Sequence, residues 1–187
     1  MSAEKIKQTI EHLRKGNILL YPTDTLWGIG CDATNPVAVE KVFALKKRSD
    51  QKSLIALVNS VAFLERYVKQ IPEVCYELLD NSDKPLTIVY ENPINIAENA
   101  VAEDGSMGFR VTTDPICQRI IQQLNKPLIS TSANLSGDSS PTCFDDVSPV
   151  IKSGVDFILD ERTKEKMTKP STIIKINNDS SFKIIRK

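Results

Sequence analysis

Apolar and polar positions along this chain follow two patterns, and each pattern predicts one kind of element. Short apolar runs predict buried strands, whereas apolar positions three and four residues apart predict amphipathic helices. The predicted strands cover residues 18–21, 54–58, 86–90, 108–111, 127–130, 156–159, 172–176 and 182–185. The predicted helices cover residues 3–15, 36 to the basic run 46–52, 60–69, 72–81, 115–124 and 145–152.

The order of these elements predicts the fold class. Strands and helices alternate at first, but several late strands follow one another, so we expect an α/β fold with a mixed sheet flanked by helices. The polar segment 91–106 is predicted to be an irregular loop and a candidate lid. No internal repeat or linker divides the chain, so residues 1–187 are expected to form one domain.

Composition narrows the class of protein without pointing to a partner. Hydrophobic residues make up 41% of the chain and charged residues 26%, which is typical of globular proteins. The 24 basic residues equal the 24 acidic ones, so no global field favours nucleic acid. No apolar run reaches the roughly 18 residues of a membrane helix, and the N-terminus lacks a signal-peptide core. These features predict a cytoplasmic protein with no membrane partner.

Histidine and cysteine usage excludes several chemistries. The single His12 lies off the apolar stripe of the first helix, so we expect it at the surface. Without another histidine, a Ser-His-Asp or Cys-His system has no base. The four cysteines are widely spaced and form no CxxC pair, which favours reduced, mostly buried thiols over a zinc site.

A polar turn follows the first predicted strand, in residues 21–30. Pro, Thr and Asp break the apolar pattern there, and Trp27 stands beside two glycines. Such a turn either holds a ligand at a strand end or is an ordinary turn with a core tryptophan. The glycines also match the dinucleotide pattern GxGxxA, but no helix opens directly after them, so we do not expect a Rossmann site.

Two further clusters are candidates for chemistry. Lys46, Arg48 and Lys52 lie at the end of the second helix, where basic residues either complement the helix dipole or clamp a triphosphate. Residues 130–137 place four hydroxyls and Asn134 around one turn, which is either a ligand rim or a plain Ser/Thr turn. No Walker A sequence is present, so any ATP site lies outside the common phosphate loops.

Six ordered motifs resemble those of the YrdC-like family of threonylcarbamoyl-adenylate synthases. They are YPTDTLWG (21–28), KKR (46–48), KSL (52–54), GFRV (108–111), SANLSG (132–137) and the closing pieces KPST (169–172) and IIR (184–186). The chain departs from the family pattern in KSL for KPL and in DKPLT (83–87) for PGPxT, and it lacks the glycine that follows the last arginine. It resembles the short, single-domain form.

The resemblance implies a fold and a reaction. The fold would be a twisted mixed sheet curved around a concave, positively lined cavity. The reaction would be that of a nucleotidyltransferase, in which L-threonine, bicarbonate or CO₂ and ATP give threonylcarbamoyl-AMP and pyrophosphate. Mg²⁺ would enter with the ATP phosphates, without protein ligands of its own. Other tRNA-modification proteins would then pass the product to adenosine 37 of tRNA.

The resemblance also implies roles for particular residues. Lys46 and Arg48 would be catalytic. The implied ATP contacts are Arg48, Lys52, Ser106, Asn134, Thr142 and Arg186. The implied threonine contacts are Thr25, Leu57, Arg110, Ser132 and Ser171. Two alternatives stay open, namely an RNA-binding module and a nucleotide-binding regulator of the same fold, and weak RNA binding beside the enzymatic activity is also compatible with the sequence.

Overall fold

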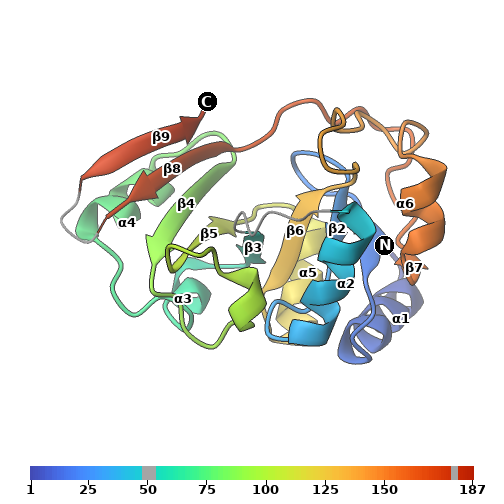
Figure 1. Cartoon of the computed structure of the whole chain (residues 1–187), viewed down its shortest axis with the longest axis horizontal. Helices are drawn as coiled ribbons and strands as arrows, with labels where there is room; N and C mark the ends of the chain where they lie inside the picture. Colours follow the sequence, from blue (N-terminus) through green and yellow to red (C-terminus); the bar gives the residue numbers. More distant parts are fainter. Residues whose placement is uncertain (48–53, 178–180) are drawn as a thin grey trace.

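Nine strands pair into one mixed sheet in the computed structural model of the protein, which describes residues 1–47, 54–177 and 181–187 (Figure 1). The strands are β1 Leu19–Tyr21, β2 Gly28–Gly30, β3 Ile55–Val58, β4 Leu86–Glu91, β5 Ser106–Val111, β6 Leu128–Ser132, β7 Phe157–Ile158, β8 Thr172–Ile176 and β9 Phe182–Arg186. Their order is β7-β1-β2-β6-β3-β5-β4-β8-β9. The pairs β1–β7, β3–β5 and β4–β8 are parallel and the other pairs are antiparallel, which confirms the predicted mixed sheet.

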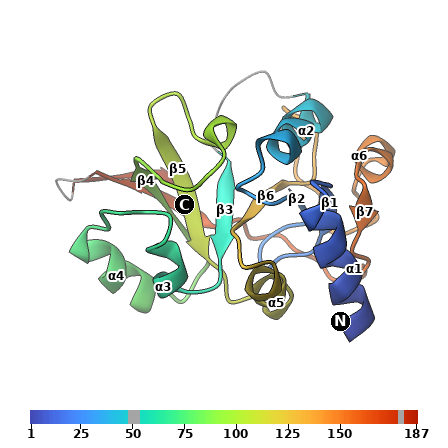
Figure 2. The same cartoon turned by 90° about the horizontal axis from the view of Figure 1, so that it is seen from below.

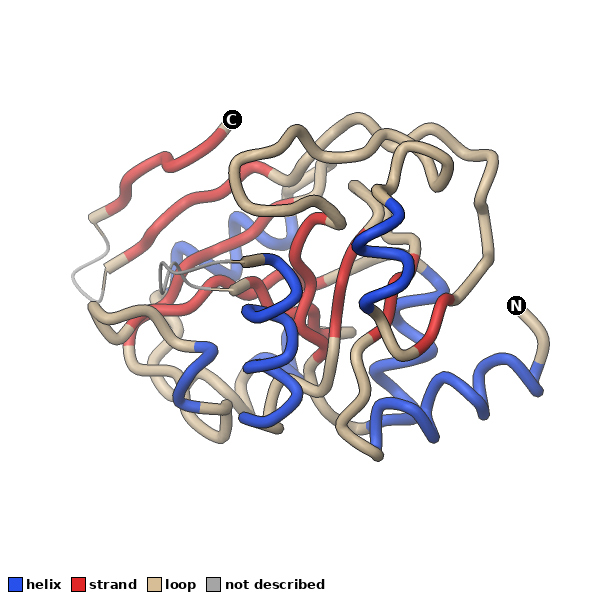
Figure 3. The backbone as a smooth tube through the Cα atoms, turned by 45° about the vertical axis from the view of Figure 1, so that its right-hand side comes forward, coloured by secondary structure: helices blue, strands red, loops and turns tan. Residues whose placement is uncertain are grey.

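Helices cover both faces of this sheet. They are α1 Ala3–Arg14, α2 Pro36–Lys46, α3 Val61–Leu64, α4 Glu73–Asp80, α5 Pro115–Leu124, α6 Pro149–Gly154 and the 3₁₀ helix η1 Glu98–Ala100. Figure 2 shows α1, α3, α4 and α5 on one side of the sheet and α2 on the other. Figure 3 shows how much of the remaining chain is irregular, above all the long loops that follow β6 and precede β8.

Helix boundaries follow the local signals in the sequence. Asn35 caps α2, because its Oδ1 accepts the backbone N–H groups of Val37 and Ala38 at 3.0 and 3.2 Å. Gly16 has φ +73° just after α1, as expected for a glycine that ends a helix. The helix predicted over 60–69 is wrong beyond Leu64. Beyond it, the backbone N–H groups of Arg66 and Tyr67 bond to the oxygens three residues earlier. The side chains of Tyr67 and Val68 are buried in the core.

The strand β2 was missed by the sequence pattern, which predicted only a turn there. Glycines are poor strand formers, and β2 exists because it pairs with both β1 and β6. A Cβ on Gly30 would lie 2.2 Å from the backbone oxygen of Ile129 and 2.6 Å from the Tyr21 ring. The GxGxxA glycines therefore serve close packing inside the sheet.

The segment 91–106, predicted to be an irregular loop and a candidate lid, is largely irregular, but it packs against the core and not over the cavity. Ala97 and Ala100 are buried in the core, and the backbone N–H of Ala97 bonds to the oxygen of Ala33 at 3.0 Å. The side chain of Asn99 donates to the oxygen of Pro36, at the start of α2, at 2.9 Å. These contacts hold the segment against α2.

Among the residues that the structure describes, no helix combines the length and the apolar character that a membrane span requires.

Candidate functional site

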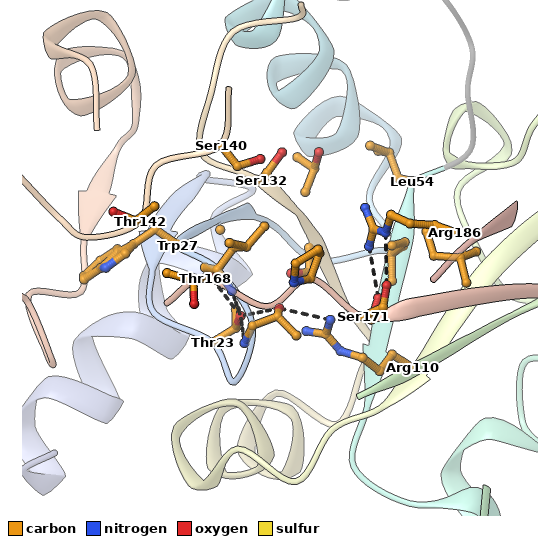
Figure 4. Close-up of a pocket in the computed structure, with 18 residues that line it drawn as sticks. Thr23, Trp27, Leu54, Arg110, Ser132, Ser140, Thr142, Thr168, Ser171 and Arg186 are labelled. Atoms are coloured by element: carbon orange, nitrogen blue, oxygen red, sulfur yellow. Dashed lines mark hydrogen bonds between the residues drawn. The ribbon is translucent and has the colours of Figure 1, made fainter. Parts of the chain in front are cut away.

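A cavity of about 400 Å³ opens where several strand ends meet (Figure 4). This volume lies within the range of small-molecule sites. Hydroxyl side chains supply much of its wall, namely those of Thr23, Thr25, Ser130, Thr131, Ser132, Ser140, Thr142, Thr168 and Ser171. Two guanidinium groups, Arg110 and Arg186, complete the polar lining. The cavity thus combines positive charge with many small hydrogen-bonding groups.

Arg110 projects from β5 and is only 4% exposed. Its Nη1 donates to the Oγ1 of Thr25 at 3.1 Å and its Nη2 to Oδ1 of Asp24 at 3.0 Å. Its Nε is buried and has no hydrogen-bond partner among the described residues. Burial raises the pKa of Asp24, and the charge of Arg110 opposes that rise. Two of the five N–H donors thus fix the guanidinium in place, and the others leave it able to bind a carboxylate.

The turn after β1 holds Thr25 in position for this contact. The Oγ1 of Thr23 accepts the backbone N–H groups of Thr25 and Leu26, both at 3.1 Å, and donates to the oxygen of Leu26 at 2.7 Å. The hydroxyls of Thr23 and Thr25 lie 3.0 Å apart. Thr23 is therefore the side chain that shapes the turn, in the manner of an ST motif.

Arg186 reaches the cavity from β9, beside Ser171. Its Nε donates to the backbone oxygen of Ser171 at 3.0 Å and its Nη2 to the Ser171 Oγ at 3.2 Å. The Ser171 hydroxyl in turn lies 2.8 Å from the Oγ1 of Thr87. Burial, and then the positive charge of Arg110, lower the pKa of Arg186. Two guanidinium groups that influence each other in one cavity favour anionic ligands.

Lys46, at the end of α2, is also buried but does not line the cavity. Its Nζ donates to the backbone oxygens of Ser132 and Asn134 at 2.6 and 2.7 Å. The structure therefore places Lys46 on the backbone of the SAN turn, and its catalytic role stays a prediction.

Asn134 and Thr142 lie on the loop that follows β6. The Nδ2 of Asn134 donates to the oxygens of Leu135 and Asp138 at 2.8 and 2.9 Å. Asn134 lines a smaller neighbouring pocket of about 290 Å³, whereas Thr142 lines the main cavity and donates to Asp146 at 2.6 Å. Their nucleotide contacts stay predictions.

Two predicted residues lie off the cavity. The Ser106 hydroxyl donates to Oδ1 of Asp104 at 2.6 Å, at the start of β5. The Leu57 side chain is fully buried in the core cluster under α1 and α5. The structure therefore does not bring either side chain to the cavity wall. Arg48 and Lys52, predicted to bind ATP phosphates, lie outside the described residues.

The structure adds cavity residues that sequence reasoning had not assigned. Thr23 stands inside the YPTDT motif, and Ser140 stands in the polar continuation of the SAN turn, so both carried a signal. Thr168 carried none, because it lies in a loop without periodicity. His12 packs on Phe157 at 4.6 Å between ring centroids and does not line the cavity.

Trp27 borders the cavity beside Thr142 (Figure 4). It is fully buried, and its ring tilts against that of Phe144 at 5.0 Å between centroids. Its Nε1–H has no hydrogen-bond partner in the described part of the chain. Trp27 therefore acts chiefly as core packing that ties the turn after β1 to the loop after β6.

Mg²⁺, bound to the phosphates of ATP, is the metal that the family resemblance implies. Over residues 1–47, 54–177 and 181–187, no group of three or more His, Cys, Asp or Glu side chains could hold a metal ion. That Mg²⁺ enters with the ATP phosphates stays a prediction.

The sequence matches a known protein family. The profile of the Sua5/YciO/YrdC family, described as telomere recombination, matches residues 11–187. A protein of Methanocaldococcus jannaschii, provisionally named threonylcarbamoyl-AMP synthase, is 36% identical over 190 residues, which cover 98% of this chain and 88% of that protein. The threonylcarbamoyl-AMP synthase of Pseudoalteromonas translucida is 31% identical over 181 residues, covering 95% of this chain and 96% of that protein.

Solved structures share the fold. P. abyssi Sua5, complexed with L-threonine, superimposes with a TM-score of 0.85 at 27% identity and covers 94% of this chain. The match covers 52% of that longer chain, so this chain spans about half of its length. E. coli YciO superimposes with a TM-score of 0.85 at 22% identity, covering 100% of this chain and 90% of its own.

Proposed function

Because this chain belongs to the Sua5/YciO/YrdC family, we propose that it is a threonylcarbamoyl-AMP synthase, a nucleotidyltransferase that acts in tRNA modification. The substrates are L-threonine, bicarbonate or CO₂ and ATP, and the products are threonylcarbamoyl-AMP and pyrophosphate. Other proteins then transfer the threonylcarbamoyl group to adenosine 37 of tRNA. The observation that carries the proposal is the one cavity that gathers Arg110, Thr25 and Ser132.

Threonine binds at the Arg110 end of the cavity. The guanidinium receives the carboxylate of threonine, because it lines the cavity, is already oriented by Asp24 and Thr25 and has further N–H donors. The hydroxyls of Ser132 and Ser171 also line this cavity and supply further hydrogen bonds. P. abyssi Sua5, the relative solved with L-threonine, supports this choice of substrate.

The reaction needs charge stabilisation more than a side-chain nucleophile. The amine of threonine and CO₂ form a carbamate, and one of its oxygens attacks the α-phosphorus of ATP while pyrophosphate leaves. A carbamate is already an anion, so no histidine base is required. Phosphoryl-type transfer depends mainly on positioning and on cations that face the phosphates. We assign that part to Arg186, Arg48 and Lys52, with Mg²⁺ supplied together with ATP.

Pyrophosphate release tests the proposal directly. The protein is incubated with Mg·ATP and bicarbonate, together with either L-threonine or L-serine. We expect threonine-dependent pyrophosphate release and a product with the mass of threonylcarbamoyl-AMP. ATP binding without threonine-dependent release would instead identify a nucleotide-binding regulator of the same fold. A purely RNA-binding protein would show RNA affinity that falls steeply with salt and no release.

A further inference from the structure

A strap of chain between β7 and β8, residues 159–171, runs along the cavity. In Figure 1 it crosses the top of the molecule from the side of β7 to β8. Its last part carries Thr168, Pro170 and Ser171, which line the cavity. Most of the strap has no regular structure, so a few side-chain and backbone contacts must decide where it lies.

One side chain anchors the first part of the strap. Arg162 has φ +55°, an uncommon backbone conformation for an arginine, and its Nε donates to Glu165 at 2.7 Å. Its Nη1 forms an ion pair with Oδ2 of Asp114, whose side chain is only 2% exposed. Further along the strap, the N–H of Met167 bonds to the oxygen of Thr142 at 2.6 Å.

Asp114 belongs to the neighbourhood of Arg110. Its Oδ1 caps α5 by accepting the N–H groups of Ile116 and Cys117 at 2.9 and 3.0 Å. Burial raises the pKa of the Cys117 thiol, the carboxylates of Asp114 and Asp24 raise it further, and Arg110 opposes them. The Cys117 Sγ also lies 3.8 Å from the backbone oxygen of Pro22, two residues before Asp24, so the Asp114 cap of α5 adjoins the turn that holds the Arg110–Asp24 pair.

We propose that Arg162 is a positioning residue for threonine, which anchors the strap over the cavity and neutralises Asp114 so that Arg110 stays available for the substrate carboxylate. Arg162 does not line the cavity itself and acts through these two groups. Without Arg162, the buried Asp114 carboxylate would lack its cation and would attract Arg110, the guanidinium four residues earlier in the chain. At the same time Thr168 and Ser171 would lose the anchor of their segment.

Kinetics of Arg162→Ala test this inference, and this part of the test rests on the proposed function. We expect the KM for threonine to rise about tenfold, because a weakened hydrogen bond to the substrate carboxylate has an effect of about this size. The KM for ATP and kcat should change by less than about twofold. Arg162→Lys, which keeps the charge beside Asp114, should restore most of the threonine affinity. Equal rises in both KM values, or no rise for threonine, would overturn the proposal.

A second readout does not depend on the reaction. Lys164 and Lys166 are exposed on the strap, so trypsin can report its anchoring. Arg162→Ala should be cut after these lysines faster than the parent protein. The matched control is Lys126→Met, which removes another cation from a buried aspartate, Asp32, away from the cavity.

The two readouts separate failure of the inference from failure of the proposed function. The control should leave strap cleavage and the KM for threonine unchanged. If the parent protein releases no pyrophosphate, the proposed function fails, and the inference is then judged by trypsin and by threonine affinity in calorimetry. Unchanged cleavage and unchanged threonine affinity in Arg162→Ala would overturn the inference alone.

Discussion

Arg110 and Lys46 are both buried cations, each 4% exposed, yet their charges serve different parts of the molecule. Arg110 is held by two side chains, Asp24 and Thr25, and lines the cavity. Lys46 donates to two backbone oxygens, those of Ser132 and Asn134, and does not line the cavity. A guanidinium has donors to spare after it is oriented, whereas an ammonium held by carbonyls fixes the loop that contains them. Burial alone therefore does not distinguish a cation that lines the cavity from one that holds a loop.

The comparison predicts its largest effect at Arg110. Arg110→Lys keeps a positive charge beside Asp24 but loses the planar fork, so kcat/KM for threonine should fall about a hundredfold. Steady-state pyrophosphate release measures this loss. The melting temperature should stay close to that of the parent protein, because Asp24 keeps a cation. If kcat/KM for threonine stayed at the parent value, Arg110 would not be a threonine-binding residue.

Lys46→Met should lower the stability of the protein more than its affinity for threonine. The carbonyl oxygens of Ser132 and Asn134 would lose charge-assisted hydrogen bonds, so the free energy of unfolding should fall by about 2 kcal/mol. Urea unfolding measures that change. Because the SAN turn would loosen, the KM for ATP should rise more than the KM for threonine. A variant with parent-like stability and no turnover would show instead that Lys46 acts in the reaction itself.

Ser132→Ala separates the role of the cavity from that of the Lys46 contact, because Ser132 takes part in both. Its hydroxyl lines the cavity, whereas its backbone oxygen receives the Lys46 ammonium and survives the substitution. We expect the KM for threonine to rise about tenfold, which corresponds to one lost hydrogen bond to a charged or buried partner. Stability should change by less than about 0.5 kcal/mol. Equal losses for threonine and ATP would contradict this assignment.

The smallest effect is expected at an ion pair outside both regions, that of Lys175 with Asp104. Lys175 donates to Asp104 at 2.7 Å, and this bond and that from Ser106 lower the Asp104 pKa to about 2. The folded-state pKa lies below the ordinary value of 3.8, so this stabilisation exists above about pH 4 and is lost as the pH falls toward 2. Asp104 is more than half exposed, so Asp104→Asn should cost less than about 1 kcal/mol.

Thermal melts between pH 2 and 6 test this expectation. The difference between Asp104→Asn and the parent should shrink as the pH falls, because the parent carboxylate becomes protonated. The KM for ATP should stay within about twofold of the parent value, since Ser106 does not line the cavity. A large change in that KM would support the predicted contact between Ser106 and the nucleotide.

Local rules predicted most of the elements, whereas the site residues were predicted from the family resemblance. Caps such as Asn35 and apolar runs such as β4 follow from nearest neighbours along the chain, and they were confirmed. Thr25, Arg110, Ser132, Thr142, Ser171 and Arg186 line the cavity, in agreement with their predicted place in one site. Their individual roles stay predictions. The strand β2 and the true position of segment 91–106 depend on distant partners, which no local pattern contains.

The sequence by itself determined the fold class, the motifs and the presence of hydroxyl-rich turns, because these depend on residue type and spacing. Tertiary structure alone decided that Lys46 holds a backbone turn and that Lys175 pairs with Asp104, 71 positions away in the chain. It alone also brought Arg162 next to Asp114, 48 positions away in the chain. The physical reason is that a charged side chain takes the partner that lies nearest in space, and that partner is fixed only when the strands have paired.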